Sequence, residues 1–149
     1  MANKKVFLDT NIVADLIDAS RNGHKLAMKL LEKLLLAECE ICISEDMLST
    51  LFYISNDKNR TLDFFENVIF IDWHVLAFGR DIIMQATKLS KQLNCDLEDL
   101  LQCFCAKKNS CEILISNDKK FHNCGIELIG IADFLQNARH SDRSGGISG

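Results

Sequence analysis

Three aspartates stand where apolar or helical segments of the chain meet polar residues. Asp9 ends one apolar run, Asp118 follows another, and Asp99 lies in the first turn of a predicted helix that leads into the second run. In an open parallel sheet, ligands gather outside the carboxyl ends of the strands. We therefore expect Asp9 and Asp118 to face one crevice, with the helix start placing Asp99 beside them.

Carboxylates gathered in this way have a defined chemistry. They repel one another and raise each other's pKa values unless a cation lies among them. Their hard oxygen atoms suit Mg²⁺ or Mn²⁺. Such a metal lowers the pKa of a bound water and stabilises the leaving oxygen in a phosphoryl displacement. The pattern predicts metal-dependent phosphodiester hydrolysis that requires no nucleophilic side chain.

Asp96 has two interpretations. It precedes Asp99 by three residues, on the same helical face, so it could be a further metal ligand. It also stands at the N-cap of the predicted helix, and capping alone explains it. Asp9 lacks such an explanation, because Asn11 can cap the helix that follows it. The helix dipole explains three other acids near predicted helix starts: Glu45, Asp46 and Glu98.

Strands and helices alternate along the chain with short connections. The predicted strands cover residues 6–8, 41–43, 68–72, 112–116 and 126–129. The predicted helices cover residues 12–17, 24–38, 45–54, 61–67, 81–93, 97–108 and 131–138. This order predicts an α/β fold, a single-domain parallel sheet of about five strands flanked by helices on both faces.

Length and composition fit one globular domain. The chain has 149 residues, of which 48% are hydrophobic and 26% charged. No apolar run approaches the roughly 20 residues that cross a bilayer, and the first residues hold no signal peptide. We expect a cytoplasmic protein with no membrane contact. The domain should span residues 1–140, and the polar, Gly/Ser-rich residues 141–149 should form a disordered tail.

The seven cysteines favour neither a disulfide framework nor zinc. Their number is odd and no secretory signal precedes them. Cys39 and Cys42 would point to opposite faces of a strand, and Cys103 and Cys105 diverge on a helix. We expect buried, reduced thiols.

The net charge of −4 does not exclude a nucleic-acid substrate. A sequence-independent duplex binder is normally basic, but metal ions held by carboxylates reverse the local field. Candidate phosphate contacts are Arg60, Lys107, Lys108, Lys119 and Lys120, although a solvated surface charge explains each of them better. Phe121 could stack a base, although core packing explains it better.

Three segments resemble, in order, the motifs of the PIN domain family. They are Val6–Asn11, in which a hydrophobic strand runs into Asp-Thr-Asn; Asp96–Gln102 with Ala106; and Ile113–Phe121. The resemblance extends from residue 6 to about residue 135 and implies a PIN-like Rossmannoid fold. By this resemblance the metal-binding acids are Asp9, Asp99 and Asp118. The supporting polar groups would be Thr10, Asn11 and Ser116.

Many members of that family are VapC-type toxin ribonucleases. The resemblance therefore implies metal-dependent endonucleolytic cleavage of RNA, with Mg²⁺ or Mn²⁺ as cofactor. It also implies an antitoxin protein that inserts a peptide near the active site, and a homodimer. The leucine-rich segment 26–36 offers apolar surface for either partner, and core packing explains it equally well.

One position departs from the family pattern. The family usually places a glutamate six residues after a serine that ends the second strand, and counting from Ser44 that position is Thr50. Threonine cannot replace the charge of a carboxylate. The alternative is a catalytically weak or inactive PIN-like module that binds RNA or protein. Two other folds with an aspartate after the first strand fit worse. A haloacid-dehalogenase-like phosphatase needs an acid where Asn11 stands. A phosphate-receiver domain needs two adjacent acids after the first strand and a lysine at the last, and this sequence has neither.

Overall fold

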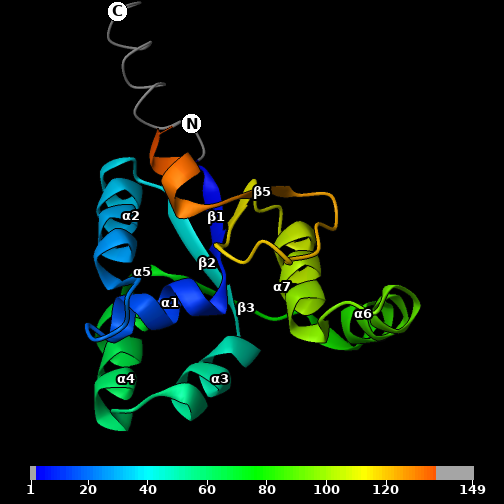
Figure 1. Ribbon diagram of the computed structural model, residues 1–149, viewed down its shortest axis with the longest axis horizontal. Helices are drawn as coiled ribbons and strands as arrows, with labels where there is room; N and C mark the ends of the chain where they lie inside the picture. The colour runs from blue at the N-terminus through cyan, green and yellow to red at the C-terminus, as the bar shows by residue number, and fades with distance from the viewer. Residues whose placement is uncertain (1–2, 137–149) are drawn as a thin grey trace, which may run out of the picture.

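Five parallel strands form the sheet at the centre of the computed structural model, which describes residues 3–136 (Figure 1). The strands are β1 (Lys5–Leu8), β2 (Glu40–Ser44), β3 (His74–Leu76), β4 (Ile113–Ile115) and β5 (Glu127–Ile129). Their order is β3-β2-β1-β4-β5, and every neighbouring pair is parallel. The predicted parallel α/β sheet is confirmed.

Helices flank this sheet, with α1 and α2 on one side of β1 and α7 on the other (Figure 1). The helical segments are α1 (Thr10–Ile17), α2 (His24–Leu36), α3 (Asp46–Ile54), α4 (Lys58–Phe64), the π-helical η1 (Phe65–Ile69), α5 (Phe70–Asp72), α6 (Gly79–Leu93) and α7 (Leu97–Lys108). Residues 131–136 are also helical. Within residues 3–136 no helix combines the length and apolar character that crossing a membrane requires. The predicted tail at 141–149 lies outside the described residues.

The central strands explain why the apolar runs are continuous. Val6, Phe7 and Leu8 of β1 are all fully buried, as is Leu114 of β4. A parallel strand covered by helices on both faces has no solvent side and therefore needs no polar alternation. The runs predicted at 6–8 and 112–116 are strands for this reason.

The predicted strand at residues 68–72 is wrong. This segment is helical, and the third strand is only His74–Leu76. Phe65 and Ile69, four residues apart, are buried, whereas Phe70 and Ile71 are more than half exposed, which is the pattern of one helical face. A short apolar run does not separate a strand from a helix by its period, so the sequence pattern was ambiguous here.

A disulfide corrects the expectation that all thiols are reduced. Cys103 of α7 is bonded to Cys124, which lies 21 residues further along the chain, and the other five cysteines are free. The bond ties α7 to the connection between β4 and β5, the segment that carries Asp118. The pairing depends on that connection folding back onto α7, which no local sequence pattern reveals.

Candidate functional site

An acidic cleft of about 550 Å³ opens beyond the carboxyl ends of β1 and β4. Its acidic lining consists of Asp9, Asp96, Glu98, Asp99 and Asp118. The uncharged polar residues Thr10, Asn11, Thr50 and Gln102 complete much of the wall, and Lys120 also lines it. The residues that the sequence predicted to meet are therefore neighbours on one cavity.

Strand pairing brings the two most distant acids together. Leu8 of β1 pairs with Ile115 of β4, and the Asp9 N–H donates to the Ile115 carbonyl at 3.0 Å. Asp9 follows β1 directly and is only 5% exposed. Asp118 follows β4 after Ser116 and Asn117 and is exposed. Both carboxylates thus come from strand ends that lie side by side in the sheet.

Asp9 occupies the N-cap position of α1 without capping it. The helix begins at Thr10, and the Asp9 side chain makes no capping hydrogen bond to it. The expectation that Asn11 caps this helix is wrong, because Asn11 lies inside the first turn. The Asp9 carboxylate is turned to the cleft instead, so a structural role in capping does not account for it.

Ser116 connects Asp9 with Asp118. Its hydroxyl donates to Asp9 Oδ2 at 2.7 Å and accepts the Asp118 N–H at 3.1 Å. The Asp118 carboxylate in turn accepts the Lys120 N–H at 2.9 Å through Oδ1. One buried hydroxyl therefore orients the first acid and fixes the backbone of the second.

The first turn of α7 supplies the remaining acids. Asp96 is its N-cap residue, and its Oδ1 accepts the Asp99 N–H at 3.0 Å. The capping interpretation of Asp96 is confirmed, and its carboxylate lines the cleft as well. Asp99 itself makes no side-chain hydrogen bond or ion pair with any residue the structure describes.

Sequence reasoning missed two groups of the site. Gln102 Nε2 donates to Thr10 Oγ1 at 2.9 Å, and Thr10 Oγ1 donates to Glu98 Oε1 at 3.2 Å. This chain of hydrogen bonds joins the first turn of α1 to α7. Glu98 was explained by the helix dipole alone, yet its carboxylate lines the cleft. Gln102 is 1% exposed, and a polar residue on the buried face of a helix is the signal that could have identified it.

The acids share a strongly negative environment. Burial, followed by the charges of Asp96, Asp9, Asp118 and Glu98, raises the pKa of Asp99 to about 7. Burial also raises the pKa of Asp9, to which the charge of Asp118 adds, and the Ser116 hydrogen bond opposes this shift. Across residues 3–136, neither lysine nor arginine forms an ion pair with these carboxylates.

A divalent cation fits this cleft in donor type and charge. Carboxylate oxygens are ligands that Mg²⁺ and Mn²⁺ prefer, and a cation would relieve the repulsion that, together with burial, raises the pKa of Asp99. In the part of the chain that the structure describes, however, no three acidic, histidine or cysteine side chains are arranged as a ready metal-binding set. The fit therefore rests on chemistry and electrostatics.

The pKa of Asp99 predicts how pH changes the stability of the metal-free protein. The folded-state pKa of about 7 lies above the ordinary value of 3.8, so the folded protein keeps a proton that the unfolded chain releases. This contribution to stability is full below the ordinary value and is lost as pH rises through about 7. When the pH is raised from about 5 to about 8 in EDTA, the urea midpoint should decrease more for the wild type than for Asp99→Asn.

The matched control for this comparison is Asp63→Asn, which neutralises an exposed carboxylate on α4 outside the cleft. Its midpoint should follow the wild type at both pH values. Equal falls in all three proteins would contradict the coupling of Asp99 to the other acids.

The basic and aromatic residues considered as RNA contacts have different surroundings. Lys120 lines the cleft, whereas Lys107 and Lys108 donate to the backbone carbonyls of Cys124 and Phe78. Phe121 is 6% exposed and packs in the core, as expected. Of the candidate phosphate contacts, Lys120 is the one that lines the acidic cleft.

Comparison with known proteins gives consistent results. The family model of the PIN domain matches residues 6–126. Ribonuclease VapC1 of Aquifex aeolicus (strain VF5) is 32% identical over 141 residues, which cover 91% of this chain and 96% of that protein. The chain is also similar in structure to Mycobacterium tuberculosis VapC20, a Sarcin-Ricin loop cleaving toxin, with a TM-score of 0.66, 17% identity, and 81% and 95% of the two chains covered.

A second solved structure has the same fold. VapBC2 from Rickettsia felis, bound to a DNA fragment from their promoter, matches with a TM-score of 0.65 and 21% identity. The match covers 85% of this chain and 98% of that chain. At these identities the two structures establish the fold alone.

Proposed function

This chain belongs to the PIN domain family, and we propose that it is a metal-dependent endoribonuclease that hydrolyses RNA phosphodiester bonds in the acidic cleft. The observation that carries the proposal is the convergence of Asp9, Asp99 and Asp118 on one cleft, where burial and then the charges of the neighbouring acids raise the pKa of Asp99 to about 7. A relative that is named a ribonuclease and aligns over 91% of this chain supports the same reaction.

In this proposal Asp9, Asp99 and Asp118 hold Mg²⁺ or Mn²⁺. The bound metal supplies a water of lowered pKa and a positive charge for the leaving oxygen. Asp96 contributes mainly charge, because one of its oxygens accepts the Asp99 N–H. Its other carboxylate oxygen is a candidate fourth ligand of the metal.

The remaining polar groups position these acids. Ser116 holds Asp9 in one orientation through the 2.7 Å hydrogen bond, which keeps the carboxylate from rotating away from the cleft. Thr10 and Gln102 lock the first turn of α1 against α7, so that the acids of the two elements keep their spacing. Lys120 at the wall of the cleft offers a cation to an RNA phosphate.

Metal removal tests the proposed reaction. Purified protein should cleave single-stranded RNA in Mn²⁺ or Mg²⁺, stop in EDTA, and recover when the metal is restored. Because water is the nucleophile, the products should carry no 2′,3′-cyclic phosphate. Cleavage that continues in EDTA and leaves cyclic phosphate ends would contradict a metal-dependent hydrolysis.

The proposal includes a partner protein. One structural relative is described as a toxin, and this chain is proposed as the toxin of a toxin–antitoxin pair. Co-expression with the product of the neighbouring open reading frame should yield a complex in which RNA cleavage is inhibited. A homodimer of this chain also belongs to the proposal, with light scattering as its measurement.

A second candidate function is a PIN-like module that binds RNA or protein without cutting. Thr50 favours it, because this residue lines the acidic cleft at the position where the family pattern has a glutamate. The module would bind RNA in the presence of metal but release no products.

A further inference from the structure

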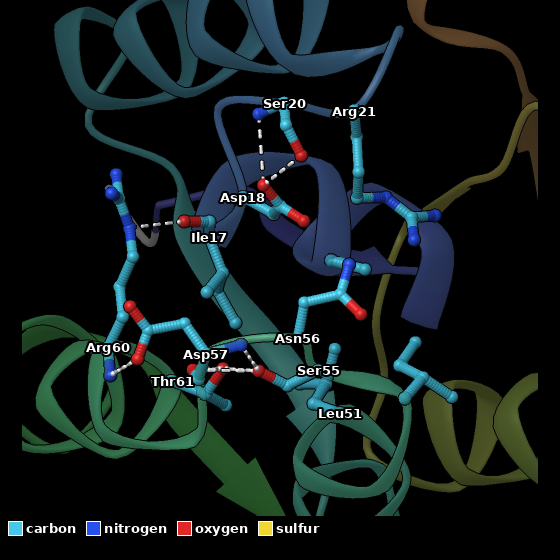
Figure 2. Close-up of a pocket in the computed structure, with 12 residues that line it drawn as sticks. Ile17, Asp18, Ser20, Arg21, Leu51, Ser55, Asn56, Asp57, Arg60 and Thr61 are labelled. Atoms are coloured by element: carbon cyan, nitrogen blue, oxygen red, sulfur yellow. Dashed lines mark hydrogen bonds between the residues drawn. The ribbon is translucent and has the colours of Figure 1, made fainter.

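A smaller pocket lies beside the acidic cleft, between α1, the end of α3 and the start of α4 (Figure 2). Its volume is about 160 Å³. Ile54 lines both cavities, so the last turn of α3 is the wall between them. Thr50 faces the acidic cleft and Leu51 faces the smaller pocket. A polymeric ligand that extends from the cleft past Ile54 would therefore reach this pocket.

The pocket combines an apolar floor with a polar rim. Ala14, Ile17 and Leu51 are buried and form the floor. The polar residues of the rim are Asp18, Ser20, Arg21, Asn56, Asp57 and Arg60. We call this cavity the Asn56 pocket. An apolar floor under hydrogen-bonding groups suits an unstacked base of RNA, which has apolar ring faces and polar edges.

Two arginines are held at the rim with donors to spare. Arg21 Nε donates to Asp15 Oδ1 at 2.7 Å, and Arg60 Nε donates to the Ile17 carbonyl at 2.9 Å. The terminal nitrogens of both guanidinium groups have no hydrogen-bond partner within residues 3–136. Each group is therefore oriented by one bond and presents its remaining N–H groups to a phosphate or its plane to a base.

Asn56 and Asp18 offer complementary hydrogen-bonding groups. Asn56 lies in the connection between α3 and α4, is exposed, and directs its amide towards α1 (Figure 2). Its side chain makes no hydrogen bond to any described residue, so both the donor and the acceptor of the amide are available. Asp18 accepts the Ser20 N–H and hydroxyl through Oδ1, which leaves Oδ2 as an acceptor.

We propose that the Asn56 pocket is a base subsite, in which one unstacked base of single-stranded RNA lies while a neighbouring phosphodiester occupies the acidic cleft. The inference rests on the proposed ribonuclease function and adds to it the class of substrate. The base carries an exocyclic amino group, because the Asp18 carboxylate can only accept a hydrogen bond. Uracil has no amino group, and its one ring N–H lies between two carbonyl oxygens that the carboxylate repels. Adenine, cytosine and guanine meet this requirement.

The size of the pocket supports a single base and not a whole ligand. Pockets that enclose a complete small molecule measure roughly 300–1,000 Å³. The Asn56 pocket, at about 160 Å³, is well below that range. A planar ring attached to a longer chain fits this volume, and the rest of that chain lies outside it.

The test compares wild type, Asn56→Ala and Asn56→Asp on fluorescent oligo(A), oligo(C) and oligo(U). Binding is measured by anisotropy in Ca²⁺, and cut positions are mapped on a random-sequence RNA in Mn²⁺. The wild type should prefer the amino-bearing oligonucleotides over oligo(U). Both variants should lose about tenfold in affinity for the preferred oligonucleotide, the size of effect expected of one base-reading side chain. They should also lose the base preference next to the cut.

Asn59→Ala is the matched control, since Asn59 is exposed on α4 and does not line the pocket. It should bind and cut as the wild type does. If the wild type binds RNA but never cuts it, the ribonuclease proposal fails. The affinities of the wild type and the Asn56 variants for the three oligonucleotides then still test the subsite. Asn56 variants with wild-type affinity and base preference overturn the subsite. So do variants that bind RNA normally but lose the co-expressed neighbouring protein, because the pocket would then hold a peptide.

Discussion

Replacement of Asp9 by asparagine is expected to reduce RNA cleavage by roughly 10²–10³-fold, since a bound metal supplies several kcal/mol of transition-state stabilisation. Asp9 is the most buried acid of the cleft, at 5% exposed, and the carboxylate that Ser116 holds in place. Asparagine keeps the size of the side chain and one acceptor oxygen for the Ser116 hydroxyl. The loss should therefore come from the missing charge and not from a change of fold.

Initial rates on one single-stranded RNA in Mn²⁺ measure this effect. The control is Asp63→Asn, the same chemical change on an exposed face of α4, which should retain the wild-type rate. In Mn²⁺-free buffer, both variants should have the circular dichroism spectrum of the wild type. Their thermal unfolding temperatures should match that of the wild type, or be higher in the case of Asp9→Asn. Cleavage that persists unchanged in Asp9→Asn would identify a contaminating nuclease and contradict the role of Asp9.

Introduction of glutamate at Thr50 is expected to raise the apparent affinity for Mn²⁺ by roughly 10–100-fold, the range over which groups around a metal site alter its binding. Thr50 is half-buried on α3 and lines the acidic cleft. A carboxylate at this position adds both charge and oxygen ligands to the acids that already line the cleft. The rate of RNA cleavage at low Mn²⁺ should rise with the affinity.

The same substitution should destabilise the metal-free protein, because one more carboxylate joins a cleft where burial and neighbouring charges already raise the pKa of Asp99 to about 7. Ser49→Glu is the matched control, since Ser49 is exposed on α3 and does not line the cleft. Manganese-dependent rates and urea midpoints are the two measurements. A Thr50→Glu protein that behaves like Ser49→Glu in both would show that Thr50 does not limit the metal site.

The fold could be predicted where burial leaves a distinctive pattern. The runs before Asp9 and Asp118 are strands because they are covered on both faces, and the helix from Leu97 to Lys108 begins after Asp96, the N-cap predicted for it. The apolar run at residues 68–72 gave no such distinction, and it became a helix with one buried face. Its neighbour β3 is a short edge strand that shows little apolar pattern.

Some residues of the candidate site could likewise be predicted from the sequence and others could not. Asp9, Asp99 and Asp118 were predicted because strand ends and a helix start place them at one edge of a parallel sheet, and Ser116 was predicted from the family resemblance. Gln102 and Glu98 depend on contacts across about 90 residues of chain, between α1 and α7. The disulfide between Cys103 and Cys124 likewise joins two separate elements, α7 and the connection between β4 and β5. Sequence spacing does not reveal which elements will meet, so these groups were missed.

The Asn56 pocket was beyond prediction for a related reason. Its lining comes from α1, the connection after it, the end of α3 and the start of α4. Arg60 was considered as a phosphate contact, but its position depends on the bond to the Ile17 carbonyl at the end of α1. The shape of a cavity assembled from separate helices follows from their packing.

Direct titration with Mn²⁺, followed by electron paramagnetic resonance of the free ion, tests the proposed metal site without relying on activity. At a pH above the Asp99 value of about 7, the wild type should remove Mn²⁺ from solution, and Asp9→Asn and Asp99→Asn should each bind it at least about tenfold more weakly. Asp63→Asn should bind as the wild type does. A wild type that leaves the free Mn²⁺ signal unchanged, or acid variants that bind as tightly as it does, would contradict a metal site formed by these aspartates.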